Sequence, residues 1–144
     1  MEQRLTLVTL GVADLTRATR FYEDVVGWKK VEGPDGVSFF DLGGQVFALW
    51  PHAELAKDMT IAEDALPRYR GMSLAYNTRS EDEVNRIFAD LKAKGATIVK
   101  EPTKVFWGGY AGYFADPDGH HWEVAFNPFW TVRADGRVTM TPPT

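Results

Sequence analysis

Hydrophobic and polar residues follow two patterns that alternate along the chain and predict strands and helices in a fixed order. Residues 5–12 are rich in β-branched and apolar side chains, which is typical of a strand. Apolar residues then recur at helical spacing: Leu15, Ala18, Phe21, Tyr22, Val25 and Val26. Asp14 can cap this helix at its start, and Gly27 can end it. Three short strands are expected next, at 29–31, 37–41 and 45–50.

The second half of the chain repeats this order of elements. Residues 72–78 read as a strand, and Ser80 with Glu83 has the spacing of a helix capping box. The helix that follows carries one apolar stripe: Val84, Ile87, Phe88 and Leu91. Gly95 can end that helix. Three more strands are expected, at 97–100, 110–115 and 121–126.

The two halves can be aligned by two shifts in residue number, one for the first strand and the helix and one for the later strands. A shift of 66 places Val8 on Leu74, and a shift of 75 places Leu49 on Val124. Such internal similarity indicates a duplicated unit. We therefore expect an α+β fold of two βαβββ modules, with a ligand cleft between their sheets. The expected organisation is a single domain with four parts: repeat one 1–50, a connection 51–71 with one short helical turn, repeat two 72–127, and a hairpin-like tail 128–144.

Composition narrows the classes of function. The chain has 144 residues, which fits one domain. Its net charge of −4 argues against nucleic acid as a partner, because phosphate binding needs a basic face. The absence of cysteine excludes thiolate metal sites and a cysteine nucleophile. No apolar run is long enough for a membrane span, and the first residues lack a signal-peptide pattern, so we expect a cytoplasmic protein without a membrane partner.

Two segments carry a resemblance to a known family. The first is LGVADL at 10–15, followed by Phe21-Tyr22 and Gly27-Trp28, and the second is FADPDGHHWEV at 114–124. Together they resemble the vicinal-oxygen-chelate superfamily, which contains glyoxalases, bleomycin resistance proteins and extradiol dioxygenases. The segment 127–130 is similar to the end of a glyoxalase-like bacterial subgroup. The resemblance implies a homodimer, and a divalent metal that polarises vicinal oxygens of a substrate.

The resemblance also implies four positions for metal ligands, of which this chain fills one well. They fall on Leu7 and Ala48 in repeat one and on Ser73 and Glu123 in repeat two. Leu7 and Ala48 have no donor atom, and Ser73 is a poor ligand for zinc, iron or manganese. We therefore expect no metal cofactor, with a residual metal at Glu123 as the alternative.

Strand alternation suggests which side chains accompany Glu123. His121 lies two residues before it and shares its face. The pair can be an acid–base or residual metal pair, or simply inherited polar residues; Glu123 is the candidate catalytic residue in the first case. We expect a ligand-binding set of aromatic and polar residues: Thr9, Trp50, Asn77, Trp107, Tyr110, Tyr113, His121 and Glu123. His52, beside Pro51, is expected to be exposed to solvent.

Two hypotheses for function follow from the residues and the resemblance. The first is a protein that binds a small apolar or aromatic molecule in a metal-poor cleft, similar to bleomycin resistance proteins. The second is a metal-dependent glyoxalase-like lyase, isomerase or extradiol dioxygenase with an atypical site around Glu123 and His121. Missing ligands favour the first hypothesis, and the retained Glu123 keeps the second open.

Overall fold

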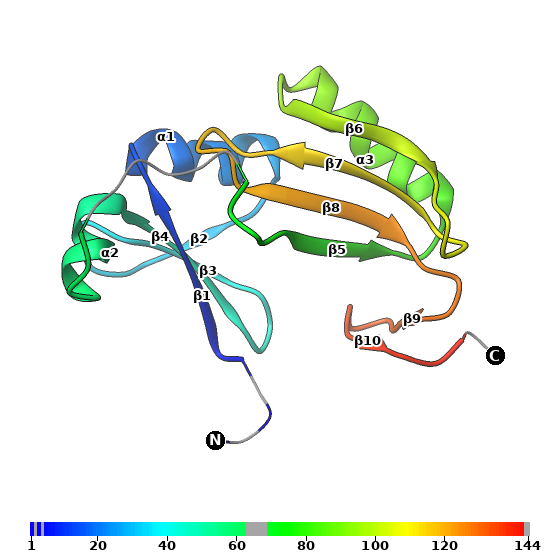
Figure 1. Cartoon of the computed structure of the whole chain (residues 1–144), viewed down its shortest axis with the longest axis horizontal. Helices are drawn as coiled ribbons and strands as arrows, with labels where there is room; N and C mark the ends of the chain where they lie inside the picture. Colours follow the sequence, from blue (N-terminus) through cyan, green and yellow to red (C-terminus); the bar gives the residue numbers. More distant parts are fainter. Residues whose placement is uncertain (2, 4, 63–68, 143–144) are drawn as a thin grey trace. The chain divides into compact units, whose positions relative to one another are not determined.

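The chain forms two compact units, Met1–Arg70 and Gly71–Thr144, each with its own mixed sheet (Figure 1). The computed structural model describes residues 1, 3, 5–62 and 69–142. In each unit a strand and a helix precede three further strands. The predicted α+β fold with a duplicated βαβββ order is therefore confirmed, and the second unit begins one residue before predicted repeat two.

Unit 1 is built on a four-stranded sheet in the order β1-β4-β3-β2. Its elements are β1 (Leu7–Val12), α1 (Leu15–Arg20), the π-helical turn η1 (Phe21–Val25), β2 (Lys30–Val31), β3 (Ser38–Asp41), β4 (Val46–Pro51) and α2 (His52–Asp58). β1 runs parallel to β4, and the other pairs are antiparallel. The predicted first helix thus continues beyond α1 as η1, where the amide of Val26 donates to the carbonyl of Phe21 across 3.1 Å.

Aromatic packing fills the space between the helix and the sheet of unit 1. Tyr22 is fully buried, and its ring centre lies 4.8 Å from that of Phe47 and 5.9 Å from that of Phe40. Trp28 stacks on Tyr22 at 5.6 Å. Buried aromatic side chains of this size dominate the energetics of a hydrophobic core. Tyr22 thereby marks the face of the sheet that α1 and η1 cover.

Unit 2 repeats the plan with the sheet order β5-β8-β7-β6. Its elements are β5 (Leu74–Thr78), α3 (Glu81–Ala93), β6 (Thr97–Lys104), β7 (Tyr110–Ala115), β8 (His121–Phe126), β9 (Thr131–Val132) and β10 (Val138–Thr139). The predicted capping residue is confirmed, because Ser80 Oγ accepts from the amide of Glu83 at 3.2 Å. The carboxylate of Glu83 accepts from the amide of Arg79. The apolar stripe of α3 buries Val84, Phe88 and Leu91.

Strand register confirms the predicted shifts between the two halves. Thr9 pairs with Ala48 in unit 1, and Ala75 pairs with Glu123 in unit 2, which are the same positions after shifts of 66 and 75. β6 departs from the prediction, since it continues four residues past Lys100. Its register with β7 shifts on both sides of Lys100, and such bulges accommodate Pro102, which has no amide proton to donate.

The connection and the tail are partly as expected. Pro51 belongs to β4, and α2 has seven residues, which is longer than the predicted single turn. Residues 63–68 of the connection lie outside the described residues. The predicted tail hairpin is confirmed by the antiparallel pairing of β9 with β10.

In the described ranges, no helix combines the length and apolar character that crossing a membrane requires.

Candidate functional site

In each unit one face of the sheet packs on the helix that follows the first strand, α1 with η1 in unit 1 and α3 in unit 2, and the other face is turned away from that helix. In unit 2 the helix side is fixed by Gly112, because a methyl group there would lie 2.5 Å from the ring of Phe88 on α3. Alternation along β7 therefore turns Tyr113 away from α3. Residues that pair across neighbouring strands share a face, so the register extends this face from β7 to β8 and β5. The residues that share the helix-free face with Tyr113 include Ala75, Asn77, Ala111, His121, Glu123 and Ala125.

Tyr113 and Glu123 form the polar centre of this face. The hydroxyl of Tyr113 donates to Oε1 of Glu123 at 3.1 Å, and both side chains are half-buried. Burial raises the pKa of Tyr113 above its ordinary value, and the charge of Glu123 and the hydrogen bond raise the pKa of Tyr113 further. Tyr113 thus keeps its proton at neutral pH and acts as a donor to the carboxylate.

Small side chains surround this pair. Ala75 faces Glu123 from β5, while Ala111 and Ala125 occupy the next positions along β7 and β8. Ala111 and Ala125 are buried, and Ala75 is exposed. Of the predicted site residues, Asn77 and His121 lie on the same face and are half-buried. The structure therefore brings together four members of the predicted set: Asn77, Tyr113, His121 and Glu123.

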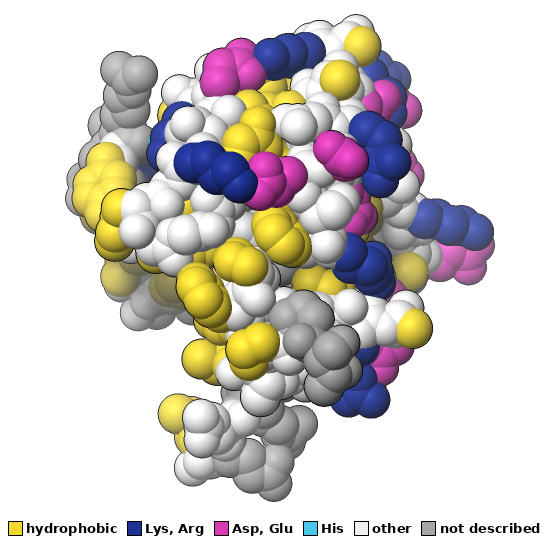
Figure 2. Space-filling model, turned by 90° about the vertical axis from the view of Figure 1, so that its right-hand side faces the viewer, with side chains coloured by type: hydrophobic (Ala, Val, Ile, Leu, Met, Phe, Trp, Pro, Cys, Tyr) yellow, Lys and Arg dark blue, Asp and Glu magenta, His cyan; other side chains and the backbone are white. Residues whose placement is uncertain are grey.

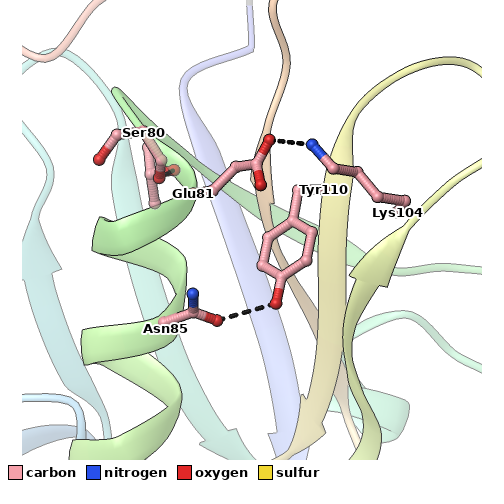
Figure 3. A network of polar contacts seen from close by, with 6 residues as sticks. Ser80, Glu81, Asn85, Lys104 and Tyr110 are labelled. Atoms are coloured by element: carbon pink, nitrogen blue, oxygen red, sulfur yellow. Dashed lines mark hydrogen bonds and ion pairs between the residues drawn. The ribbon is translucent and has the colours of Figure 1, made fainter.

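Tyr110 does not belong with this group, which corrects the prediction. Its hydroxyl donates to Oδ1 of Asn85 on α3 at 2.9 Å, so the ring lies on the helix side of the sheet (Figure 3). Lys104 lies over the ring of Tyr110 at 5.8 Å and pairs with Glu81 in the first turn of α3. Because Tyr110 and Tyr113 are three residues apart in one strand, they point to opposite faces. Tyr110 ties the β6–β7 hairpin to α3.

Trp107 borders the helix-free face at the β6–β7 turn. A methyl group at Gly109 would lie 1.9 Å from ring atom Cζ3 of Trp107, so the ring packs directly on the backbone of Gly109. Residue 109 lies four positions before Tyr113, so alternation directs it to the same face as Tyr113 and Glu123. The ring of Trp107 therefore lies on that face. Trp107 is half-buried. It can therefore form an aromatic wall at the end of this face.

The surface around α3 and β6 differs in character from the face of Glu123. Lys92 pairs with Glu101 at 2.7 Å, and Lys94 pairs with Asp90 at 2.8 Å. Figure 2 shows Lys and Arg side chains next to Asp and Glu side chains on this side, with hydrophobic side chains between them. Exposed pairs of this kind contribute little to stability, and they give no single-sign patch for a charged partner.

In unit 1, α2 contacts at Gly11 the sheet face that is turned away from α1 and η1. Thr9 and Trp50 lie on this face. Alternation places them opposite to Phe47, whose ring packs on Tyr22. Both are half-buried. At the other end of this face lies a groove of about 550 Å³. Its lining residues are Thr6, Leu7, Val31, Phe39, Asp41, Gly44, Gln45 and Val46.

Sequence reasoning missed two features of unit 1. The groove joins Val31 and Phe39, which pair across β2 and β3, with Leu7 on a distant strand. His52 was expected to be exposed, but it is half-buried and packs on Gly11, where a methyl group would lie 2.4 Å from Nδ1. Sequence alternation alone did not reveal the groove, because Leu7, Val46 and Phe39 fall on one face only once the strand register is known.

Comparison with known proteins assigns the family. Residues 4–124 match the sequence model of the Glyoxalase/Bleomycin resistance protein/Dioxygenase superfamily. The chain belongs to this superfamily. The metallothiol transferase FosB of Staphylococcus saprophyticus is 30% identical over 124 residues, which cover 86% of this chain and 77% of that protein.

Solved structures of the superfamily agree with this assignment. A glyoxalase-related enzyme from Fulvimarina pelagi superimposes with a TM-score of 0.85 and 38% identity, covering 96% of this chain and 99% of that chain. A glyoxalase/bleomycin resistance protein/dioxygenase from Nocardioides superimposes with a TM-score of 0.78 and 24% identity, covering 88% of this chain and 84% of that chain. The second likeness shows the fold alone.

The superfamily implies a metal, and the described side chains at the four implied ligand positions do not fit one. Leu7 lines an apolar groove and Ala48 is 1% exposed, so neither position offers a donor atom. Ser73 is exposed and lies outside β5. Among the described residues, no three histidine, aspartate or glutamate side chains form a group that could hold a metal ion. Glu123 alone, already bonded to Tyr113, is too little for a stable metal site.

Proposed function

We propose that this superfamily member binds a small, apolar or aromatic molecule on a sheet face that is turned away from α1 or from α3, with no resident metal. The observation that carries the proposal is the groove of unit 1, where Leu7, at a position for which the family resemblance implies a metal ligand, lies with Val31, Phe39 and Val46. Binding sites for small molecules are mostly apolar, with a few polar groups that fix orientation. Unit 2 has polar groups of this kind on its own sheet face, at Asn77, Tyr113, His121 and Glu123, and the ring of Trp107 borders that face.

Elemental analysis and ligand titration test this proposal together. Protein purified without added metal or chelator is analysed for zinc, iron, manganese and nickel, and we expect far less than one ion per chain. The protein is then titrated with a series of planar aromatic compounds while its tryptophan fluorescence is recorded. Saturable quenching by apolar members of the series supports the proposal.

A pair of variants locates the apolar site. Leu7→Asp places a charge in the groove at a residue that is 43% exposed, so the fold tolerates it. We expect it to weaken binding about tenfold or more, since a carboxylate must be desolvated by an apolar ligand. Ile61→Asp is the matched control, because Ile61 is an exposed aliphatic residue outside the groove lining. Equal weakening by both variants would show that net charge, rather than the groove, governs binding.

The second candidate is a metal-dependent enzyme, and the similarity to a metallothiol transferase favours it. In that case a thiol transferase, lyase, isomerase or dioxygenase site would form around Glu123 and His121. Near-stoichiometric metal that Glu123→Gln removes, together with turnover that requires the metal, would establish this candidate and overturn the first. We also propose that the chain is a homodimer, as the family resemblance implies, which light scattering during size-exclusion chromatography would measure.

A further inference from the structure

The carboxylate of Glu123 has an unusual setting for a half-buried charge. Its Oε1 accepts from the Tyr113 hydroxyl, which is a neutral donor. Among the residues that the structure describes, no lysine, arginine or histidine forms an ion pair with Glu123. A half-buried carboxylate without a counter-charge is costly, and a cation that reached it would recover part of that cost.

The basic residues nearest to Glu123 in the sheet share its face but form no ion pair with it. His121 shares the face with Glu123 but is two residues along β8, about 7 Å away by strand geometry. Lys100 is the cross-strand partner of Tyr113 on β6 and lies on the same face, one strand beyond Tyr113, and its ammonium forms no ion pair with Glu123. Ala75 and Ala125 are the other neighbours of Glu123 on this face, and neither has a polar side chain. Among the described residues, the hydrogen-bond partner of the Glu123 carboxylate is therefore the Tyr113 hydroxyl.

The hydrogen-bonding positions that remain free on the Tyr113–Glu123 pair are all acceptors. A carboxylate only accepts, and the single proton of Tyr113 is already directed at Glu123. The remaining lone pairs of the carboxylate and of the phenol oxygen are acceptors. The pair therefore offers a ligand acceptors and no donor, together with one negative charge.

We propose that the ligand of this protein carries a protonated nitrogen group, such as an amine or amidine, on its apolar or aromatic body, and that this group binds the Tyr113–Glu123 pair. The inference rests on the proposed function, whose ligand class it names. Charge-assisted hydrogen bonds to a carboxylate are about twice as strong as neutral ones. The alanines beside the pair leave room for the attached ring, and Trp107 lies on the same side of β7.

Three isosteric probes separate charge from shape: benzamidine, benzamide and benzoate share one ring and differ in the group they present. Each is titrated into the isotope-labelled full chain, and amide NMR shifts report which residues respond. We expect benzamidine to perturb β7 and β8 around Tyr113 and Glu123 and to bind about tenfold more tightly than benzoate, a difference of about 1.4 kcal/mol. Equal binding of benzamidine and benzoate overturns the inference.

Variants assign the preference to the pair. Glu123→Gln keeps the shape and can still accept from Tyr113, but it removes the charge, so the preference for benzamidine is expected to vanish. Tyr113→Phe keeps the charge and is expected to retain the preference. Glu101→Gln removes an equal charge from an exposed ion pair with Lys92 and serves as the matched control, with the preference unchanged. If Glu123→Gln retains the preference, the inference is wrong.

The two proposals fail in different ways. If apolar compounds quench tryptophan fluorescence while benzamidine leaves β7 and β8 unperturbed, the ligand class named here is wrong and the proposed function stands. If neither the apolar series nor any of the three probes binds, the proposed function itself is wrong, and the inference falls with it.

Discussion

Tyr113 and Glu123 are cross-strand partners on β7 and β8, and the phenol hydroxyl donates to the carboxylate at 3.1 Å. This contact couples the protonation of the tyrosine to folding. Burial, the negative charge of Glu123 and the hydrogen bond all raise the pKa of Tyr113 above 10.0. The folded protein therefore favours the neutral phenol more strongly than the unfolded chain does.

The sign of the pH dependence follows from this difference. Below pH about 10 the tyrosine is neutral in both states and adds no slope. Above it the unfolded chain loses the proton first, so it binds fewer protons and stability falls as pH rises toward the folded-state pKa. We expect urea unfolding of the wild type to show a steeper alkaline loss of stability than Tyr113→Phe shows. The control is Tyr76→Phe, which removes a hydroxyl from a residue that is 46% exposed and is expected to leave the alkaline slope of the wild type unchanged. Equal slopes for the wild type and Tyr113→Phe would refute the coupling.

The second prediction concerns the start of α3. Ser80 Oγ accepts from the amide of Glu83, one of the amides that lack a partner within the helix. Ser80→Ala is expected to lower the free energy of unfolding by about 1 kcal/mol, whereas Ser80→Asp retains a cap and most of the stability. Ser73→Ala, at an exposed serine outside the helix, is expected to change stability by less than about 0.5 kcal/mol. Denaturant titration measures all three, and no loss in Ser80→Ala would contradict the capping role.

The third prediction tests the contact between Gly11 and His52. A methyl group at residue 11 would lie 2.4 Å from Nδ1 of His52, so the imidazole has to move in Gly11→Ala. We expect a loss of about 1–3 kcal/mol, typical of overpacking. Because the obstacle is a side chain, Gly11→Ala combined with His52→Ala is expected to be more stable than the sum of the single changes predicts. Additive effects in this double-mutant cycle would show that the two residues are not in contact.

The order of elements could be read from the sequence because each rests on a local period. The stripe of Val84, Phe88 and Leu91 and the cap at Ser80 lie within one short segment, and the structure confirms them. The length of β6 could not be read in the same way, because Pro102 in the sequence argues against a continuing strand. The strand continues because bulges on both sides of Lys100 absorb the proline.

The candidate site was predicted less well than the fold, and Tyr110 shows why. Tyr110 and Tyr113 were both assigned to the ligand set, although alternation along one strand allows only one of them on a given face. The hydrogen bond to Asn85 decides that Tyr110 faces α3. The groove beside Leu7 depended on more than local patterns, since Leu7 meets Val46 through the pairing of β1 with β4, which are distant in sequence. Local patterns do not contain that register.

The last prediction contrasts a second glycine with Gly11. A methyl group at Gly112 would lie 2.5 Å from the ring of Phe88, 2.8 Å from the carbonyl oxygen of Lys100 and 2.9 Å from the nitrogen of Pro102. Two of these obstacles are backbone atoms of β6, which cannot rotate away as a side chain does.

We therefore expect Gly112→Ala to lower the free energy of unfolding by about 3 kcal/mol or more, because β6 and β7 have to separate at the bulge. This loss exceeds the one expected for Gly11→Ala. Trimming the ring with Phe88→Leu cannot rescue Gly112→Ala, since the backbone contacts remain. Thermal unfolding of the single and double variants measures this difference. If Phe88→Leu restores the stability of Gly112→Ala, the side chain alone was the obstacle, and β6 does not approach β7 as closely as its register indicates.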